Sequence, residues 1–364
     1  MTRLIEILIS LAIVAALFLI VGIALPSSRH LSHSVETNRK LTIVFDTVNS
    51  LRRFKEWNPL ARRDPNMEIK LSGKEEGVGA RLDYSSKERA LGNGSWEIVK
   101  SEPGKLVGYK ITNPERGENK RSEFTLKRTG KNDRNVEITQ SYDVDYGWNL
   151  LGRYSGLYVS SNVGEDVKIG LTQLSNLLAT VPNYDYSKLG EKDPANAPKI
   201  VDRPAENVLS VTAAVERNND KIKGQIHSNM EWINKVIAAN GLEAVGPIRI
   251  VTNEFGTETY SFDVVQVVRK IGDTGTGDAT KLDVKVEGPG NPVKAELLPA
   301  TKVAVASSGG HNMAGLPPVR DAVRAWALTR GYTTSDRPYE AWKAGIDQSF
   351  DPALGQFDVY WPVK

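Results

Sequence analysis

The chain of 364 residues has no cysteine, only four histidines and almost no surplus of charge. The absence of cysteine excludes disulfides, thiolate nucleophiles and cysteine-ligated metals, and it suits an oxidising compartment. The histidines (His30, His33, His227 and His311) are dispersed and lack the spacing of a metal site, so we expect neither a metal nor a cofactor. A net charge of +3, from 47 basic and 44 acidic residues, gives no electrostatic reason to expect nucleic acid as a partner.

Two glycine-rich stretches lack the residues that catalysis or phosphate binding would require. SSGGH (307–311) does not have the G-x-S-x-G pattern of a nucleophilic serine, and a glycine turn between a strand and a helix explains it better. GDTGTGD (272–278) lacks the lysine and the following helix of a phosphate loop, which favours a flexible connector. Since no paired carboxylates stand out either, the sequence favours a receptacle over a catalyst.

One long apolar run is present, from Ile7 to Leu25, with 19 residues and no charge. At about 1.5 Å per residue, such a helix nearly spans a hydrocarbon core of about 30 Å. A cleaved signal peptide is the alternative, but the run is longer than usual for one, and Arg3 is the only basic residue before it. We therefore expect residues 1–30 to be an uncleaved, single-pass anchor in the inner membrane.

Two sequence features give opposite indications of the side of the membrane on which the soluble domains lie. Arg29, Arg39 and Lys40 outnumber Arg3, and a count of basic residues would keep the body in the cytoplasm. Against that, only six residues precede the apolar run, which is typical of a signal anchor whose N-terminus stays inside. We expect soluble domains on the periplasmic side.

Residues 31–181 have the pattern of one domain. A short strand (31–37) and a helix (40–50) are followed by period-2 segments separated by turn residues, which predict a meander of antiparallel strands. These segments are 67–71, 80–84, 94–100, 106–111, 122–127 and 135–144. The amphipathic stretch Val159–Val181 then predicts a long helix. A strongly curved sheet around that helix would fit this order and would tend to enclose a cavity.

Residues 182–205 contain four prolines and no periodicity, which predicts a linker. Residues 206–364 contain an internal repeat. Each copy reads as strand, helix and two strands, and the copies end in SFDVVQVV (261–268) and QFDVYWPV (356–363). We expect two βαββ units, related by a pseudo-dyad, to pair into one mostly antiparallel sheet backed by helices. The fold class is therefore α+β, with one transmembrane helix.

Family resemblances can be added to these patterns. Residues 31–181 resemble the START-like superfamily, also called SRPBCC or polyketide cyclase-like, through VFDTVNSLRRFKEWNPL, GVGARLDYSS, GNGSWEIVKSEPGKLVGYKI and the closing helix. That resemblance implies a helix-grip fold with an apolar pocket between sheet and helix. Residues 206–364 resemble the gyrase-inhibitor-like, or AraC-type, effector-binding domain through the duplicated unit, RPYEAW and DVYWPVK. In that family an acidic residue of the second copy lines a ligand pocket, and the match here is Glu340.

The candidate ligand-binding residues follow from this second resemblance and from the repeat. Aligning GPIR (246–249) with RPYE (337–340) makes Arg249 and Glu340 equivalent, so either of them is expected at a central cleft. Nearby aromatic rings could help a carboxylate to hold a cation, but period 2 allows only some of them to share its face. Two alternatives stay open: Arg249 and Glu340 form a structural ion pair, or they simply face solvent on alternating strands. The aromatic candidates are Trp326, Tyr339, Trp342 and Tyr360.

The stretch EWNPLARRDPNM (56–67) combines charges, prolines and a tryptophan. Because it follows a helix and precedes the meander, we interpret it as a hinge at the mouth of a cavity, not as a reactive cluster. Arg62, Arg63 and Asp64 are expected to face water. Trp57 is expected to contact whatever the cavity holds.

These features predict membrane-anchored binding or sensing of hydrophobic or amphipathic small molecules, including cationic aromatic ones, without DNA binding. Two alternatives stay open. The chain would be an enzyme, a cyclase or hydrolase of a hydrophobic substrate, if Glu340 served as acid or base. It would be a ligand-dependent interaction module if a loaded effector domain regulated a protein partner.

Overall fold

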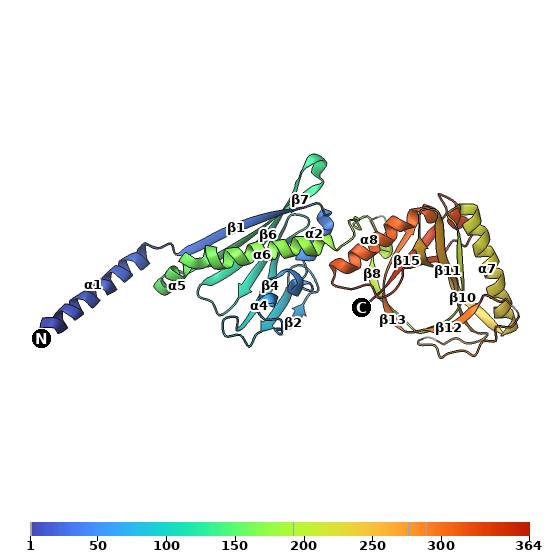
Figure 1. The fold of residues 1–364 in the computed structure, drawn as a ribbon, viewed down its shortest axis with the longest axis horizontal. Coiled ribbons are helices and arrows are strands. Elements are labelled where there is room, and N and C mark those ends of the chain that lie inside the picture. The colour runs from blue at the N-terminus through green and yellow to red at the C-terminus, as the bar shows by residue number, and fades with distance from the viewer. Residues whose placement is uncertain (1, 192, 276, 289) are drawn as a thin grey trace. The chain divides into compact units, whose positions relative to one another are not determined.

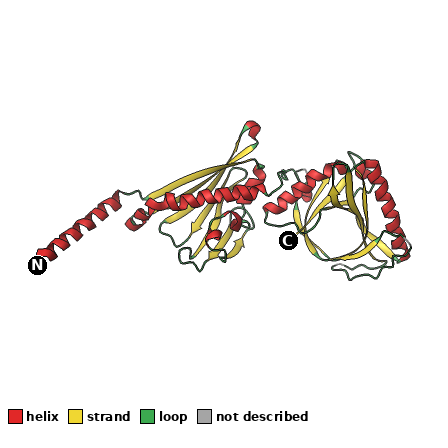
Figure 2. Ribbon diagram, in the orientation of Figure 1, coloured by secondary structure: helices red, strands yellow, loops and turns green. Residues whose placement is uncertain are grey.

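The computed structural model describes residues 2–191, 193–275, 277–288 and 290–364. It has two compact units, Met1–Val181 and Pro182–Lys364. Each unit contains one antiparallel sheet with helices packed against it, which confirms the expected α+β class (Figure 2). Thr276 of GDTGTGD and Lys192 of the expected linker lie outside the described residues.

The first unit begins with α1 (Thr2–Ala24), a helix long and apolar enough to cross a membrane by length and composition. From Leu4 to Ile23 its large aliphatic side chains are exposed, and Phe18 stacks on Tyr154. Gly22 is the exception and is buried against α5 (Leu150–Ser155).

A seven-stranded antiparallel sheet forms the rest of the first unit with α6 (Val159–Ala179), in the order β1-β7-β6-β5-β4-β3-β2. All strands expected from the period-2 segments are present. They are β1 (Ser28–Thr37), β2 (Glu68–Gly73), β3 (Ala80–Ser85), β4 (Asn93–Glu102), β5 (Leu106–Thr112), β6 (Glu118–Thr129) and β7 (Asn135–Asp145).

The long helix α6 lies along one face of this sheet (Figure 1). Its buried stripe includes Val167, Leu171, Leu174 and Leu178, as the amphipathic spacing predicts. Three short helices precede the meander: α2 (Leu41–Val48) contacts both α6 and the sheet, α3 (Phe54–Trp57) contacts α6, and α4 (Leu60–Arg63) packs beside α3. The helix-grip arrangement thus places EWNPLARRDPNM beside α6, where the sheet and helix diverge.

The second unit confirms the expected duplication. The first copy contains β9 (Glu206–Glu216), α7 (Asn219–Ala239), β10 (Leu242–Phe255) and β11 (Thr259–Lys270). The second contains β13 (Thr301–Gly309), α8 (Leu316–Thr329), β14 (Tyr339–Trp342) and β15 (Gln356–Val363). Their strands form one sheet in the order β9-β11-β10-β14-β15-β13, so the copies mirror each other about the β10–β14 pair.

Two further strands extend this sheet, and the sequence did not predict them. β8 (Lys199–Arg203) lies inside 182–205, which was expected to be a linker, and it pairs with β13. β12 (Lys294–Leu298) precedes the second copy but pairs with β9 of the first. Each copy is therefore edged by the strand that precedes the other copy, and this exchange holds the two halves together by backbone hydrogen bonds.

Gly94 shows how closely the first sheet is packed. It lies directly opposite Tyr84, whose ring covers it, and a Cβ atom there would lie 2.4 Å from the Thr112 carbonyl oxygen and 2.4 Å from the Tyr84 Oη. The position therefore requires glycine because of close approach. An aromatic ring covering a strand glycine also helps to fix strand register.

We predict that Gly94→Ala lowers the free energy of unfolding of the first unit by about 1–3 kcal/mol, because a backbone oxygen cannot move aside easily. Urea denaturation of the detergent-solubilised chain measures this. The control is Gly224→Ala in α7, where a Cβ meets no atom within 4 Å. That change should stabilise the second unit by about 0.5–1 kcal/mol. Equal effects of the two substitutions would contradict the packing described for Gly94.

Candidate functional site

The stretch EWNPLARRDPNM forms the rim of a cavity in the first unit. Trp57, at the end of α3, is only 1% exposed and lines that cavity together with Arg63 of α4. Arg63 forms an ion pair with Asp166 of α6, while Asp64 is buried and accepts hydrogen bonds from the Ser86 hydroxyl and the Asn66 amide. The expectation that Asp64 faces water was wrong, because its carboxylate closes this turn.

Five aromatic rings form a cluster of edge-to-face contacts beside this cavity, with centroids 5.2–5.8 Å apart, and two of them, Trp57 and Trp96, line it. Such pairs add to the stability gained by burial. The rings belong to Phe54, Trp57, Trp96, Tyr109 and Phe124. Most of the space between α6 and the sheet is therefore filled, and the cavity measures about 90 Å³.

The small cavity has polar groups of its own. The Trp57 Nε1–H is buried and has no hydrogen-bond partner among the described residues, although buried donors nearly always have one. The amide of Gln140 donates to the Ser122 hydroxyl at 3.1 Å, and both line the cavity. Burial raises the pKa of the Asp166 carboxyl, and the Arg63 guanidinium beside it opposes that shift. The unpaired indole could donate to a water or to a small polar group.

In the second unit, the sheet has two chemically different faces. One face packs under α7 and α8 and contains Glu340, whose side chain is completely buried. The Arg320 guanidinium of α8 binds both oxygens of Glu340, with 3.0 Å between Nη2 and Oε2. Because Glu340 is held by this buried pair, its carboxylate belongs to the helix-covered core and does not line the cavity described below.

The strand register explains why Glu340 and Arg249 separate. Glu340 lies opposite Ile250, not opposite Arg249, and residues directly opposite each other share a face. The row continues through Val264 and Val359, which are equivalent in the two SFDV/QFDV tails. Ile250 is thus the counterpart of Glu340. The sequence alignment was wrong by one residue, and such a shift moves a side chain to the opposite face.

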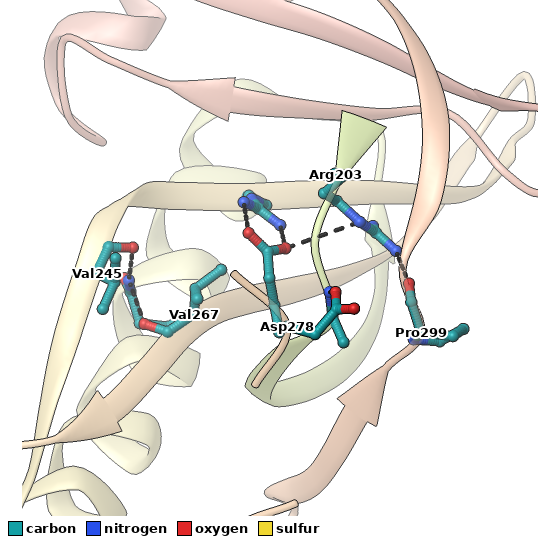
Figure 3. A network of polar contacts seen from close by, with 9 residues as sticks. Arg203, Val245, Val267, Asp278 and Pro299 are labelled. Atoms are coloured by element: carbon teal, nitrogen blue, oxygen red, sulfur yellow. Dashed lines mark hydrogen bonds and ion pairs between the residues drawn. The ribbon is translucent and has the colours of Figure 1, made fainter. Parts of the chain in front are cut away.

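Arg249 lies on the other, concave face and forms an ion pair with Glu206 at the start of β9. The two groups meet in a bidentate geometry, with 3.0 Å between Nη2 and Oε1. This excludes the alternative of an ion pair between Arg249 and Glu340. Arg203, at the end of β8, approaches the same carboxylate with 3.8 Å between Nε and Oε2 and donates to the Pro299 carbonyl (Figure 3).

At this corner of the concave face, the two arginines leave a local excess of positive charge. Arg203 and Arg249 supply two charges against one from Glu206, which leaves a surplus of one. The side chains of Arg203 and Glu206 are only 12% and 16% exposed, so water screens that surplus poorly. The Arg203 Nε is buried without a hydrogen-bond partner in the described part of the chain. The arginines can therefore donate a hydrogen bond to a further acceptor or bind an anionic group.

The arginines border a cavity of about 400 Å³. Apolar side chains from β9, β10, β11 and β12 form its wall: Val208, Val251, Val265 and Leu298. Pockets for small organic ligands usually measure about 300–1,000 Å³. The cavity of the second unit falls in this range, whereas that of the first unit is too small. A second hollow of about 440 Å³, bordered by Arg249, Glu206 and Tyr360, continues along the same face.

The aromatic candidates divide between the two faces. Tyr339 lines the cavity of about 400 Å³ and stacks on Tyr360, with 4.7 Å between ring centroids. The guanidinium of Arg249 lies 5.5 Å from the Tyr339 ring centroid, and that of Arg203 lies 6.0 Å from it. Trp342 instead packs against Phe350 and Phe357, and Trp326 belongs to α8 beside Arg330. The structure thus brings Arg249, Tyr339 and Tyr360 together and leaves Glu340, Trp326 and Trp342 elsewhere.

Sequence reasoning missed Arg203, Glu206 and the valine wall. One signal was present: VVQVV (264–268) is apolar at consecutive positions, which is typical of a strand buried on both faces. Arg203 could not have been found in this way, because β8 lay in a segment without periodicity. Its position depends on pairing with β13, about 100 residues away.

Ser308, near the end of β13, contacts His311 in the loop that follows. The Ser308 Oγ lies 2.7 Å from the His311 Nε2, and the His311 Nδ1 lies 2.9 Å from the Asn312 carbonyl oxygen. Neither residue lines the cavities described above. Among the described residues, no group of three histidine, aspartate or glutamate side chains has the geometry of a metal site.

Comparison with known proteins gave similar structures only. No protein-family model and no curated protein sequence matches the chain. The C-terminal domain of EcmrR is similar at 17% identity, covering 46% of this chain and 96% of that one, with a TM-score of 0.35. Norcoclaurine synthase from Thalictrum flavum, in complex with dopamine and hydroxybenzaldehyde, is similar at 11% identity, covering 44% and 90%, with a TM-score of 0.33.

A protein from Thermobifida fusca, solved by NMR, is similar at 16% identity, covering 42% of this chain and 93% of that one, with a TM-score of 0.33. All three likenesses have identities below 20% and TM-scores below 0.4. At identities and TM-scores this low, they support no inference about this chain's ligand or activity.

We predict that Glu340→Gln lowers the free energy of unfolding of the second unit by about 3–5 kcal/mol, because it leaves the Arg320 charge buried without its partner. The measurement is urea denaturation, with hydrogen exchange of β14 and β15 reporting on this unit. The double variant Arg320→Met/Glu340→Leu should recover most of the loss, since apolar side chains can replace a buried pair. Unchanged stability in Glu340→Gln would refute the structural role.

Proposed function

We propose that this chain is a membrane-anchored receptor that binds amphipathic small molecules in the cavity of the second unit that Val208, Val251, Val265 and Leu298 line. The observation that carries this proposal is the cavity of about 400 Å³ with valines and Leu298 on its wall and a surplus of positive charge at Arg203 and Arg249. The apolar part of a ligand would displace water from the valine wall. Its polar end would accept hydrogen bonds from the arginines, and charge-assisted bonds of this kind are the stronger ones.

The class of ligand follows from which charges face the cavity. The expectation of a cationic ligand depended on Glu340, and its carboxylate is bound by Arg320 on the other face. On the concave face, Glu206 is shared by two arginines. The corner at Arg203 and Arg249 therefore favours a carboxylate, sulfonate or similar acceptor at that end of the ligand. Elsewhere the cavity is also lined by Glu296 and by Asp263 and Asp336, and the two aspartates lie beside Arg337.

The membrane anchor is part of the same proposal. In this proposal α1 spans the inner membrane, and both units lie on its periplasmic side, where a chain without cysteine is free of unwanted oxidation. Protease treatment of intact and permeabilised spheroplasts tests the side. Digestion of both units in intact spheroplasts is expected, and protection until permeabilisation would place them in the cytoplasm.

Binding is tested by native mass spectrometry of the full chain in a non-ionic detergent, with two probes that share one alkyl tail. Decanoate carries an anionic head and decyltrimethylammonium a cationic one. We predict that decanoate is retained more strongly, and that Val251→Trp, which fills the cavity, abolishes its retention. The control is Val201→Trp, at a side chain that is 39% exposed and does not line the cavity. Equal retention of both probes in every variant would refute the site.

The role of the surplus charge is tested by Arg203→Met, which leaves the bidentate pair of Arg249 and Glu206 intact. We predict about tenfold weaker binding of decanoate, as expected for the loss of about one charge-assisted hydrogen bond. The control is Lys221→Met on α7, which removes one positive charge at a side chain that is 65% exposed and lies outside the cavity. If both variants weakened decanoate equally, the effect would come from net charge and not from the site.

A further inference from the structure

Residues 147–158, between β7 and α6, expose large apolar and aromatic side chains, whereas most other such side chains of the first unit outside α1 are buried. Trp148 is 81% exposed, Leu151 52%, Leu157 51% and Tyr158 65%. From Tyr146 to Gly164 the only charged side chain is Arg153. We call residues 147–158 the interface segment. Such a cluster of exposed apolar side chains usually marks a surface that another phase or partner covers.

The interface segment is attached to the end of α1 by Arg153. The Arg153 Nη1 donates to the carbonyl of Ile23 at 2.8 Å and to that of Leu25 at 3.2 Å, and its Nε and Nη2 donate to Gly147. The last carbonyls of a helix have no partners within it, and a cation there also complements the helix dipole. Arg153 is 7% exposed, so its charge is used within the protein.

A second contact joins the interface segment to the side of α1, before the end of that helix. The Tyr154 ring stacks on Phe18, with 4.5 Å between centroids, and its hydroxyl donates to the Phe18 carbonyl at 2.8 Å. Gly22 allows this approach, because a Cβ atom there would lie 3.2 Å from the Tyr154 ring and 3.3 Å from the Leu150 Cβ. Glycine in the last turns of α1 therefore has a packing role.

These contacts determine how deep the segment would lie if α1 crosses a bilayer. Phe18 precedes the end of α1 at Ala24 by six residues, or about 9 Å along the axis. The apolar run of 19 residues is about as long as the hydrocarbon core is thick. Tyr154 therefore cannot contact Phe18 from bulk water. It reaches the boundary between acyl chains and headgroups, and it brings α5 with it.

We propose that the interface segment is embedded in the headgroup–acyl boundary of the bilayer, on the side where α1 ends. This inference rests on the proposed anchoring by α1. Tryptophan and tyrosine are enriched at this depth, and leucines on a short helix with one buried charge suit it as well. The Arg153 guanidinium carbon lies 5.3 Å from the centroid of the Trp148 ring, so this ring would screen the charge from lipid.

The consequence is that the first unit would be held against the membrane by two elements, α1 and the interface segment. A single helix followed by a flexible chain would let the domain rotate freely. Arg153 and Tyr154 instead couple α1 to α5, and α5 leads through Gly156–Tyr158 into α6. The helix that grips the sheet would thus begin at the lipid surface.

Spin labelling tests this directly, because a chain without cysteine accepts one label at each introduced cysteine. The full chain carries a nitroxide at Leu151→Cys or Leu157→Cys and is reconstituted in vesicles of phosphatidylcholine and phosphatidylglycerol. Power saturation measures access of oxygen, which enriches in lipid, and of a neutral nickel chelate, which stays in water. The matched controls are Leu71→Cys and Val99→Cys, where the native side chains are 48% and 46% exposed on the sheet of the same unit.

We expect the ratio of oxygen access to nickel access at Leu151 and Leu157 to exceed that at Leu71 and Val99 severalfold. Ratios equal to those of the controls would overturn the inference. Low access of both reagents at Leu157 would overturn it too, because it would indicate a protein partner such as a second copy of the chain.

A label at Ile13→Cys, in the middle of α1, separates failure of this inference from failure of the anchor. If Ile13 is protected from the nickel chelate while Leu151 and Leu157 are not, α1 spans the bilayer and only the interface segment is wrongly placed. If Ile13 is itself accessible to the chelate, the anchor in the proposed function fails, and the inference fails with it.

Discussion

The second unit depends on the alternation of its strands between two faces with different chemistry. Side chains of one parity pack under α7 and α8, and those of the other parity face the concave side. Each face has one bidentate arginine–glutamate pair, Arg320 with Glu340 and Arg249 with Glu206. The first pair is dry and structural. The second borders an open cavity and has an additional arginine, so it retains the capacity to bind a further group.

Duplication explains why the sheet can supply both faces. The two βαββ copies meet at β10 and β14, and each copy is edged by the strand that precedes the other. This exchange places Arg203 of β8 and Leu298 of β12 at the rim of the cavity, although neither belongs to the repeated core. The copies have diverged at their centre, because the row that carries Ile250 in the first copy carries Glu340 in the second.

The first unit also consists of an antiparallel sheet with helices packed against it, but its interior is more completely filled. Five aromatic rings fill most of the volume between α6 and the sheet, so the cavity that remains is small. Outside this space, Arg153 and Tyr154 bind the last turns of α1. In the proposed arrangement, the first unit would serve mainly to position the chain at the membrane, and the second unit would bind the ligand.

Much of this could be predicted from the sequence alone. The period-2 segments, the amphipathic helix 159–181, the apolar run and the repeated SFDV/QFDV tails predicted the fold class, the strands of both sheets except β8 and β12, and the duplication. These are local or regularly spaced signals. Trp57 was expected at a cavity, and it lines one.

Only the tertiary structure decided which charged groups share a face. The position of Glu340 depends on a register that differs by one residue from the best sequence alignment, and one residue of shift reverses the face. The contacts of Arg203 and of Arg153 join residues that are distant along the chain or lie in segments without periodicity. Composition and spacing contain no information on such contacts, since they arise when separate elements pack together.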